Sequence, residues 1–187
     1  MTKTQTDYQI EIIHDEFAPN PRIEFDNLGT MVCFHRRYEL GDRYHGYRSS
    51  DFNSWDELKK QIIKDHDPAV ILPIYMYDHS GITISTSPFS CHWDSGQIGF
   101  IYIGRLKVMK EYNVKRITHL LKDRLTGYLK AEVETYDNYL TGSCYGYEIT
   151  KDGETIDSCW GYYGRESARQ EAEDMLMYYK SKEVVSL

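Results

Sequence analysis

Apolar and polar residues alternate in several short stretches of the chain, as expected for strands with one buried face. Seven stretches are predicted as strands, either from alternation or, as at 30–34 and 69–77, from a nearly continuous apolar run: 8–12, 30–34, 69–77, 81–85, 97–103, 143–150 and 154–162. The last two flank Asp152 and Gly153, and an Asp-Gly pair between alternating stretches is a strong hairpin signal. With these two residues as the loop, we expect Tyr147 on one face of the hairpin, and Cys144 and Cys159 on the other in diagonal positions.

Helical spacing of apolar residues marks four further segments. Ser54 and Glu57 form a capping-box pattern, and the helix that they start is expected to end before Pro68. The other three segments are 107–112, 117–140 and 165–180. The pattern predicts an α+β fold, mainly an antiparallel sheet of about six to seven strands, with one long helix and about three shorter helices. At 187 residues we expect a single domain over 1–187.

Composition narrows the possible classes of protein. With 41% apolar residues, 13 Gly and 5 Pro, the chain can form a core and is not disordered by composition. The longest apolar run, 69–77, contains Pro73 and is too short to span a membrane, and 1–5 has no apolar region of the kind that a secretory signal needs. The four cysteines do not make a disulfide framework in a chain of this size. We therefore expect a cytoplasmic protein without membrane contact and without a cofactor.

Charge is unevenly distributed along the chain. Residues 1–103 hold 9 basic and 15 acidic residues, 104–130 hold 8 and 2, and 131–187 hold 5 and 12, so a +6 middle separates acidic flanks and the total is −7. The chain also has 17 tyrosines, whose flat rings and polar tips suit half-buried sheets and partner-binding surfaces. Exposed aromatic residues are also compatible with a homodimer.

Two basic stretches are candidate binding sites for a partner or a nucleic acid. In the first, arginines alternate with tyrosines, a composition that grips phosphates and stacks on bases. The second is the N-terminal, basic half of the long helix together with the residues directly before it. The candidate residues are Arg36, Arg37, Tyr38, Arg43, Tyr44, Tyr47, Arg48, Lys115, Arg116, Lys122 and Arg124. A loop packing against an acidic surface of its own chain would have the same composition as the first stretch.

Reactive side chains are densest between 78 and 94. An alternative interpretation is a catalytic site, either a cysteine hydrolase or a metal-dependent nuclease, built from Asp78, His79, Cys91, His92 and Asp94. None of the spacings is diagnostic, since the chain has no Cys-x-x-Cys, no His-Glu-x-x-His and no phosphate-binding glycine loop. We therefore expect neither a catalytic residue nor a metal site here, but a structured loop with side chains bonded to the backbone.

The acidic residues in the second half of the long helix allow two interpretations. Glu132, Glu134 and Asp137 are possible metal ligands. Carboxylates on an exposed helix face are more often simply solvated, and this is the interpretation that we expect to hold.

Four segments of the sequence carry a resemblance to a group of small proteins from phages and plasmids of Gram-positive bacteria. The segments are 27–38, 77–102, 131–137 and 157–161, and together they extend the resemblance over most of the chain. The group has no established catalytic residues, so no functional residue is carried over.

The resemblance implies a counter-defence protein, similar to the anti-CRISPR proteins that bind and inhibit a Cas9-type effector with its guide RNA. Such a protein would act by occluding nucleic-acid binding, either with acidic and tyrosine-rich surface or with basic patches that hold the guide. The alternatives are the enzyme described above and a nucleic-acid-binding accessory protein.

Overall fold

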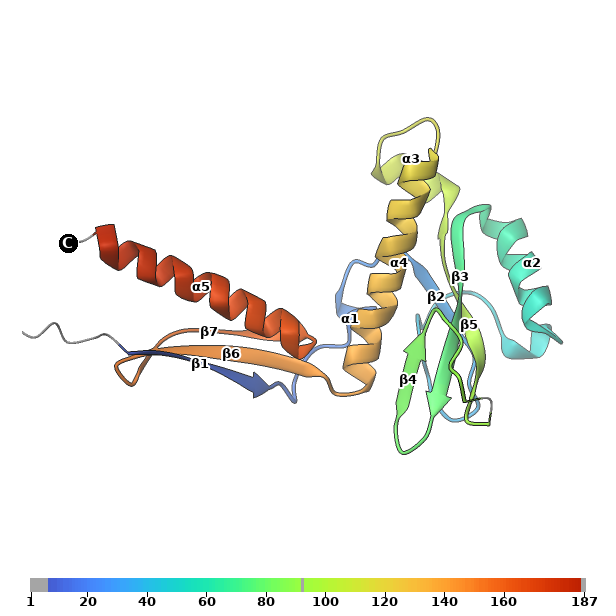
Figure 1. Ribbon diagram of the computed structural model, residues 1–187. Coiled ribbons are helices and arrows are strands. Elements are labelled where there is room, and N and C mark those ends of the chain that lie inside the picture. Colours follow the sequence, from blue (N-terminus) through green and yellow to red (C-terminus); the bar gives the residue numbers. More distant parts are fainter. Residues whose placement is uncertain (1–6, 92, 186–187) are drawn as a thin grey trace, which may run out of the picture. The chain divides into compact units, whose positions relative to one another are not determined.

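The computed structural model describes residues 7–91 and 93–185, and these form seven strands, five α-helices and one 3-10 helix (Figure 1). The predicted α+β class with antiparallel strands is confirmed. Residue contacts divide the chain into two compact units. Unit 1 comprises Met1–Pro19 and Asn138–Leu187, and unit 2 comprises Asn20–Asp137. The organisation of 1–187 as one domain stays a prediction.

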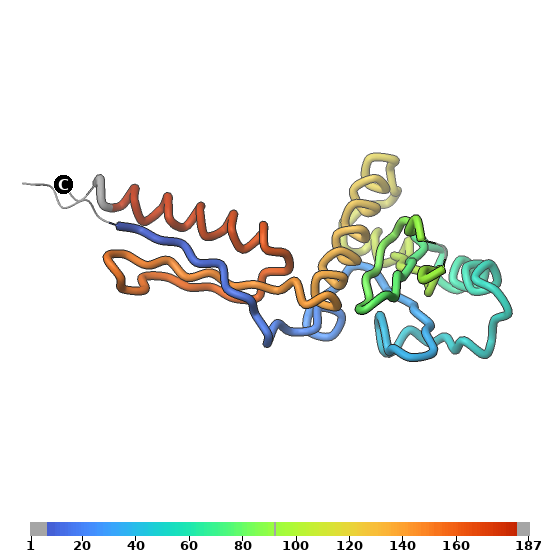
Figure 2. The backbone as a smooth tube through the Cα atoms, turned by 60° about the horizontal axis from the view of Figure 1, so that its bottom comes forward, coloured from blue at the N-terminus to red at the C-terminus, as the bar shows by residue number. Residues whose placement is uncertain are grey.

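Unit 1 is a three-stranded antiparallel sheet packed on one long helix. The strands β1 (Tyr8–His14), β6 (Cys144–Lys151) and β7 (Glu154–Tyr163) lie in the order β1-β6-β7. Helix α5 (Arg165–Val185) runs along this sheet (Figure 2). Its buried Ala172 packs with Tyr147 and Ile149 of β6. Small and apolar residues at helical spacing thus meet the alternating apolar residues of the strands.

The predicted register of the hairpin between β6 and β7 holds next to the turn, where Lys151 pairs with Glu154 and Thr150 with Thr155, but is wrong beyond it. Two irregularities in the pairing shift the strands, so that Tyr147 lies opposite Cys159, and Cys144 lies opposite Tyr163. Each irregularity adds one residue on β7, as a β-bulge does, and a bulge reverses the face of every residue beyond it. The two cysteines are therefore not diagonal neighbours, and both are free thiols.

Unit 2 is built on a four-stranded antiparallel sheet. Its strands are β2 (Thr30–Cys33), β5 (Ser95–Gly104), β3 (Pro68–Asp78) and β4 (Ile82–Ser85), in the order β2-β5-β3-β4. Six consecutive residues of β5, 98–103, are buried. A strand is apolar throughout when both of its faces are covered, and here α2 (Trp55–His66) and α4 (His119–Leu140) lie on opposite sides of the sheet (Figure 1).

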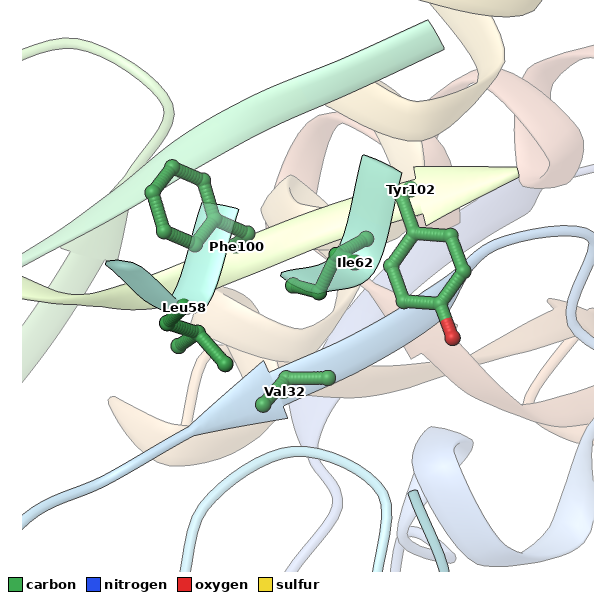
Figure 3. Packing of buried hydrophobic residues seen from close by; sticks show 5 residues of the cluster. All are labelled: Val32, Leu58, Ile62, Phe100 and Tyr102. Atoms are coloured by element: carbon green, nitrogen blue, oxygen red, sulfur yellow. The ribbon is translucent and has the colours of Figure 1, made fainter. Parts of the chain in front are cut away.

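Helix α2 begins where the capping box predicts. The Ser54 hydroxyl accepts a hydrogen bond from the Glu57 N–H at 3.2 Å, and the Glu57 carboxylate accepts one from the Asn53 N–H at 2.8 Å. The apolar face of the helix then packs on the sheet. Its residues Leu58 and Ile62 form a buried cluster with Val32, Phe100 and Tyr102 (Figure 3).

Three short helices connect the larger elements of unit 2. These are α1 (Pro21–Glu24), the 3-10 helix η1 (Ser49–Asp51) and α3 (Arg105–Glu111). The sequence predicts α3 but neither α1 nor η1, because a helix of one turn shows no periodicity. Asn20 caps α1 by accepting a hydrogen bond from the Arg22 N–H, and Pro21 occupies the first turn, where its missing N–H costs nothing.

The side chain of Arg22 is the centre of a buried ionic network. It is 1% exposed and donates two hydrogen bonds to Asp42, at 2.8 and 2.9 Å, one to Glu132 at 2.8 Å, and one to the carbonyl of Gly29 at 2.8 Å. Glu132 accepts further hydrogen bonds from the N–H groups of Leu28 and Gly29. The network joins α1, the start of β2 and the middle of α4.

Asp137, near the end of the same helix, is also engaged. Its carboxylate accepts hydrogen bonds from the Thr83 hydroxyl at 2.8 Å and from the Ile84 N–H at 2.7 Å, on the outer strand β4. The expectation that the acidic residues of α4 form a solvated face is therefore wrong for Glu132 and Asp137. Glu132 connects the helix to the segment before β2, and Asp137 connects it to β4.

We predict that Gly99→Ala disrupts the pairing of β2 with β5. A Cβ atom at Gly99 would lie 1.9 Å from the carbonyl oxygen of Val32, which is backbone and cannot move aside without breaking the ladder. We expect a loss of about 3 kcal/mol in the free energy of unfolding, measured by denaturant titration. Gly96→Ala is the matched control, since a Cβ atom there meets nothing within 4 Å. Equal stability of the two variants would contradict the prediction.

Removing the guanidinium of Arg22 should destabilise unit 2 specifically. Arg22→Met leaves the carboxylates of Asp42 and Glu132 without their cation, and we expect a loss of about 3 kcal/mol. The measurement is denaturant unfolding followed by tryptophan fluorescence in a Trp160→Phe background, because the other two tryptophans lie in unit 2. Arg48→Met, at an exposed position, is the control. A loss no larger than that of the control would show that the network contributes little.

Candidate functional site

A pocket of about 910 Å³ lies in unit 2, between the loop 34–48 and the start of α2. Its floor is apolar and is formed by the buried side chains of Cys33, Leu40, Leu58 and Tyr136. Burial raises the pKa of the Cys33 thiol to about 12, so this cysteine stays protonated and is not a nucleophile. The floor therefore supplies apolar contact and no reactive group.

Aromatic rings form the walls of the pocket. The rings of Phe34 and Trp55 stack with an interplanar angle of 17°, and those of His35 and Tyr38 stack at 5.1 Å with an angle of 11°. His45 meets Phe34 edge to face at 5.6 Å. Such walls are suited to a planar ligand, because stacking and edge contacts both favour flat aromatic groups.

Burial lowers the pKa of both histidines of the pocket. For His35, the positive charges of Arg37 and Arg36 lower it further, whereas Asp78 opposes this effect. For His45, the carboxylate of Asp42 opposes the effect of burial. A lowered pKa favours the neutral ring at pH 7. The two rings therefore act as aromatic surface and not as cations.

Charged side chains gather at the mouth of the pocket. Arg36, Glu39 and Arg43 line it and are exposed. Arg43 lies 3.9 Å from Glu39 in an ion pair whose side chains are 72% and 95% exposed, a geometry that is worth little. Arg36 has no ion-pair partner within the part of the chain that the structure describes. The mouth thus offers two guanidinium groups with little internal compensation.

The loop that carries these groups is fixed to β2. Gly41 pairs with Val32 in an isolated bridge, and the Asp42 N–H donates to the Met31 carbonyl at 2.9 Å. Gly41 has a φ of +76°, and a Cβ atom there would lie 2.7 Å from the Met31 carbonyl oxygen, so the position requires glycine. The Tyr136 hydroxyl accepts a hydrogen bond from the Gly41 N–H. The loop that carries the first basic stretch is therefore fixed to β2 and α4 at Gly41 and Asp42.

The structure separates the predicted residues of the first basic stretch into those that line the pocket and those that do not. Arg36, Tyr38 and Arg43 line the pocket. The other four do not line it: Arg37 pairs with Asp78 and lies over the Tyr38 ring, Tyr47 packs against the core and bonds to Asp65, and Tyr44 and Arg48 are exposed.

The second basic stretch is a different surface. Lys115, Arg116, Lys122 and Arg124 are exposed in the α3–α4 loop and the first turns of α4. Arg124 donates a hydrogen bond to the Tyr128 hydroxyl at 3.1 Å. This end of unit 2 lies away from the turn between β3 and β4, near which Arg37 pairs with Asp78 (Figure 1). The structure does not bring the two basic stretches together.

The cluster at 78–94 is brought together only in part. The Asp94 carboxylate lies 3.6 Å from Nδ1 of His79 and accepts a long contact of 3.9 Å from Sγ of Cys91. It thus contacts both side chains, whereas a catalytic cysteine needs the histidine as its own neighbour. Asp78 is occupied by Arg37, and His92 lies outside the described residues.

Metal ligands do not assemble within residues 7–91 and 93–185. In that part of the chain, no three His, Cys, Asp or Glu side chains gather in an arrangement that could hold a metal ion. The cluster at 78–94 supplies loop contacts instead, including a hydrogen bond from the Ser95 hydroxyl to the Cys91 carbonyl.

Three residues of the pocket lining are not predicted from the sequence as binding residues. Phe34, His45 and Trp55 line the pocket, whereas the sequence predicts only a strand, a loop and a helix at these positions. Two signals were available. The capping box places Trp55 in the first turn of α2, and Phe34 ends the predicted strand 30–34 directly before the first basic stretch. What the sequence does not indicate is that these two positions lie close together.

The net charge belongs to unit 1. Unit 1 contains 6 basic and 13 acidic residues, a difference of −7, whereas unit 2 contains 16 of each. The exposed carboxylates of unit 1, which we call the acidic surface, are Asp7, Glu11, Glu16, Asp152, Glu154, Glu166, Glu171, Glu173 and Asp174. The +6 stretch at 104–130 is balanced within unit 2 by acidic residues elsewhere in that unit.

The pocket histidines should make stability depend on pH. Because their pKa is lower in the folded protein than in the unfolded chain, the unfolded chain binds more protons below about pH 6.5, and stability falls as the pH drops through that range. We expect a smaller loss of unfolding free energy between pH 7.5 and 5.5 in His45→Gln than in the parent protein. His119→Gln, at an exposed position, is the control. Parallel pH profiles for His45→Gln and the parent would contradict the prediction.

The described residues contain no helix that is both long and apolar enough to cross a membrane. Comparison with known proteins adds no relative. No protein-family model, no curated protein and no solved structure matches the chain.

Proposed function

We propose that the chain is a non-enzymatic inhibitor that occupies the nucleic-acid channel of a nucleoprotein with the acidic surface of unit 1. The observation that carries the proposal is the division of charge, −7 on unit 1 and zero on unit 2. Complementary potentials steer association and select partners, so a unit of this charge favours a strongly cationic surface.

Four of the six basic residues of unit 1 lie over the rings of tyrosines. Lys151 and Lys180 lie over the Tyr8 ring at 5.8 and 5.6 Å, Lys182 lies over Tyr178 at 4.5 Å, and Arg165 lies over Tyr145 at 5.8 Å. Cation–π contacts of this kind hold the cations against aromatic rings on the same unit that carries the acidic surface.

A pair of like charges supports the same function. Glu11 of β1 lies directly opposite Glu148 of β6, and neither side chain has an ion pair in the described part of the chain. Like charges directly opposite each other destabilise a sheet, so the pair is a cost unless something outside the sheet offsets it. Close to this pair in the sheet, the ring of Trp160 on β7 lies against Gly146 of β6 and is 46% exposed. Exposed aromatic and acidic groups together suit a protein partner with arginine-rich surface.

The resemblance to small phage and plasmid proteins supports the finer proposal, an anti-CRISPR protein that acts on a Cas9-type effector. Such effectors hold their heteroduplex in a positively charged channel. The acidic surface of unit 1 would occupy that channel and exclude the target DNA. Inhibition would then follow from binding alone.

A target-DNA cleavage assay tests this proposal. We expect inhibition of a guide-loaded Cas9-type effector that reaches completion near one inhibitor per effector, because each inhibitor occupies one channel. Glu171→Gln/Glu173→Gln should raise the concentration for half-maximal inhibition about 3- to 10-fold, since the acidic surface loses two exposed negative charges.

The control variant removes the same charge from the other unit. Glu24→Gln/Asp26→Asn changes two exposed carboxylates of unit 2 and should inhibit as the parent does. Complete inhibition far below one inhibitor per effector would indicate turnover and contradict the proposal. So would an absence of inhibition, or equal effects of the two variants.

A further inference from the structure

We propose that the pocket of unit 2 binds a single nucleotide, with the base between the aromatic walls and the phosphate at Arg36 and Arg43. The inference goes beyond the proposed function, because the pocket belongs to the neutral unit and its ligand can be identified without any effector. It rests on the graded chemistry of the pocket, which is apolar at the floor, aromatic in the walls and cationic at the mouth.

The size and the walls of the pocket suit a base. A volume of about 910 Å³ lies in the range of small-molecule sites, and it leaves room for a base and a sugar phosphate. Bases stack on aromatic rings whatever their sequence, because every base has a π face. Tyr38 from the loop is 36% exposed and already stacks on His35, and the half-buried Trp55 from α2 stacks on Phe34, so a base would extend two existing aromatic stacks in the lining.

Polar groups in the wall can meet the edge of a base. Asn20 and Asn53 line the pocket, one before α1 and one before α2. The side-chain amide oxygen of Asn20 caps α1, which leaves the NH₂ group of the same side chain to donate. The Asn53 side chain donates to Glu57 at 3.3 Å, which leaves its carbonyl oxygen to accept. A donor and an acceptor beside aromatic rings are what a heterocyclic base edge needs.

The charges of the pocket favour an anion. Arg36 has no ion pair in the described residues, and Arg43 has one weak contact. Asp42 also lines the pocket, but its carboxylate is bound by Arg22. Glu39 is thus the one carboxylate that opposes two guanidinium groups in the described lining. Guanidinium groups bind phosphate oxygens in a forked geometry, so a phosphate at the mouth follows from this balance.

Titration of the full-length protein with defined ligands tests the inference. We would use isothermal titration calorimetry with AMP, GMP, CMP and UMP, and compare adenosine and inorganic phosphate. We expect saturable binding of at least one nucleotide, and at least tenfold weaker binding of adenosine and of phosphate, because each lacks half of the contacts. A six-residue single-stranded RNA and its duplex distinguish a free nucleotide from an unpaired residue of a strand.

Matched variants locate the ligand. Tyr38→Ala and Arg36→Gln should each weaken binding about 5- to 100-fold, since they remove a stacking surface and a phosphate contact. Tyr44→Ala and Arg48→Gln, in the same loop but outside the pocket lining, should bind as the parent does. Thermal unfolding confirms that each variant is folded. The indole N–H resonance of Trp55, assigned with Trp55→Phe, should shift on binding.

Three results would overturn the inference. The first is the absence of binding to all four nucleotides and to the single-stranded RNA. The second is binding that Tyr38→Ala and Arg36→Gln leave unchanged. The third is RNA binding that is lost in Lys122→Gln/Arg124→Gln but kept in the pocket variants, which would place the nucleic acid on the second basic stretch.

Discussion

The buried guanidinium of Arg22 is the interaction on which the architecture of unit 2 depends. A charge that is 1% exposed is stable only when its donors are bonded, and here two carboxylates and a carbonyl accept them. The accepting groups come from three parts of the chain far apart in sequence, since Gly29 precedes β2, Asp42 lies in the loop, and Glu132 lies in α4. None of them can be satisfied until the others are in place, so the network fixes the helix, the strand and the loop as one arrangement.

The pocket follows from that network. Asp42 holds the Arg22 guanidinium and also accepts a hydrogen bond from the Met31 N–H, so the loop lies beside β2 at a fixed point. Gly41 beside it makes the close approach, and Tyr136, one turn beyond Glu132 on α4, supports the loop and forms part of the floor. The residues that line the mouth stand on both sides of this point. An exposed, cationic loop thus keeps a defined shape because its centre is anchored in the core.

Local signals predicted most of the fold, and long-range contacts account for what was missed. The capping box of Ser54 and the Asp152-Gly153 turn depend on neighbours in sequence, and both predictions are confirmed. The register of the hairpin depends on bulges in β7, which no local pattern of that strand indicates. Glu132 and Asp137 looked like solvated residues because their partners lie about 50 to 110 positions away. The same reason explains the pocket. The Arg-Tyr stretch was identified as a candidate surface, but its aromatic partner Trp55 comes from another element.

The division into units also changes how the total charge is interpreted. Counted along the sequence, a +6 stretch lies between two acidic flanks, which suggests a basic centre. Counted by unit, the two flanks contribute to one unit of −7, and the basic stretch is compensated inside the other. Long-range attraction for a cationic partner therefore belongs to unit 1, whereas unit 2 can recognise an anion only at short range, where individual arginines act. If the acidic surface steers association and the pocket binds a nucleotide, as proposed above, the two tasks belong to different units, so removing carboxylates of unit 1 should slow association with a cationic partner without changing which ligand the pocket accepts.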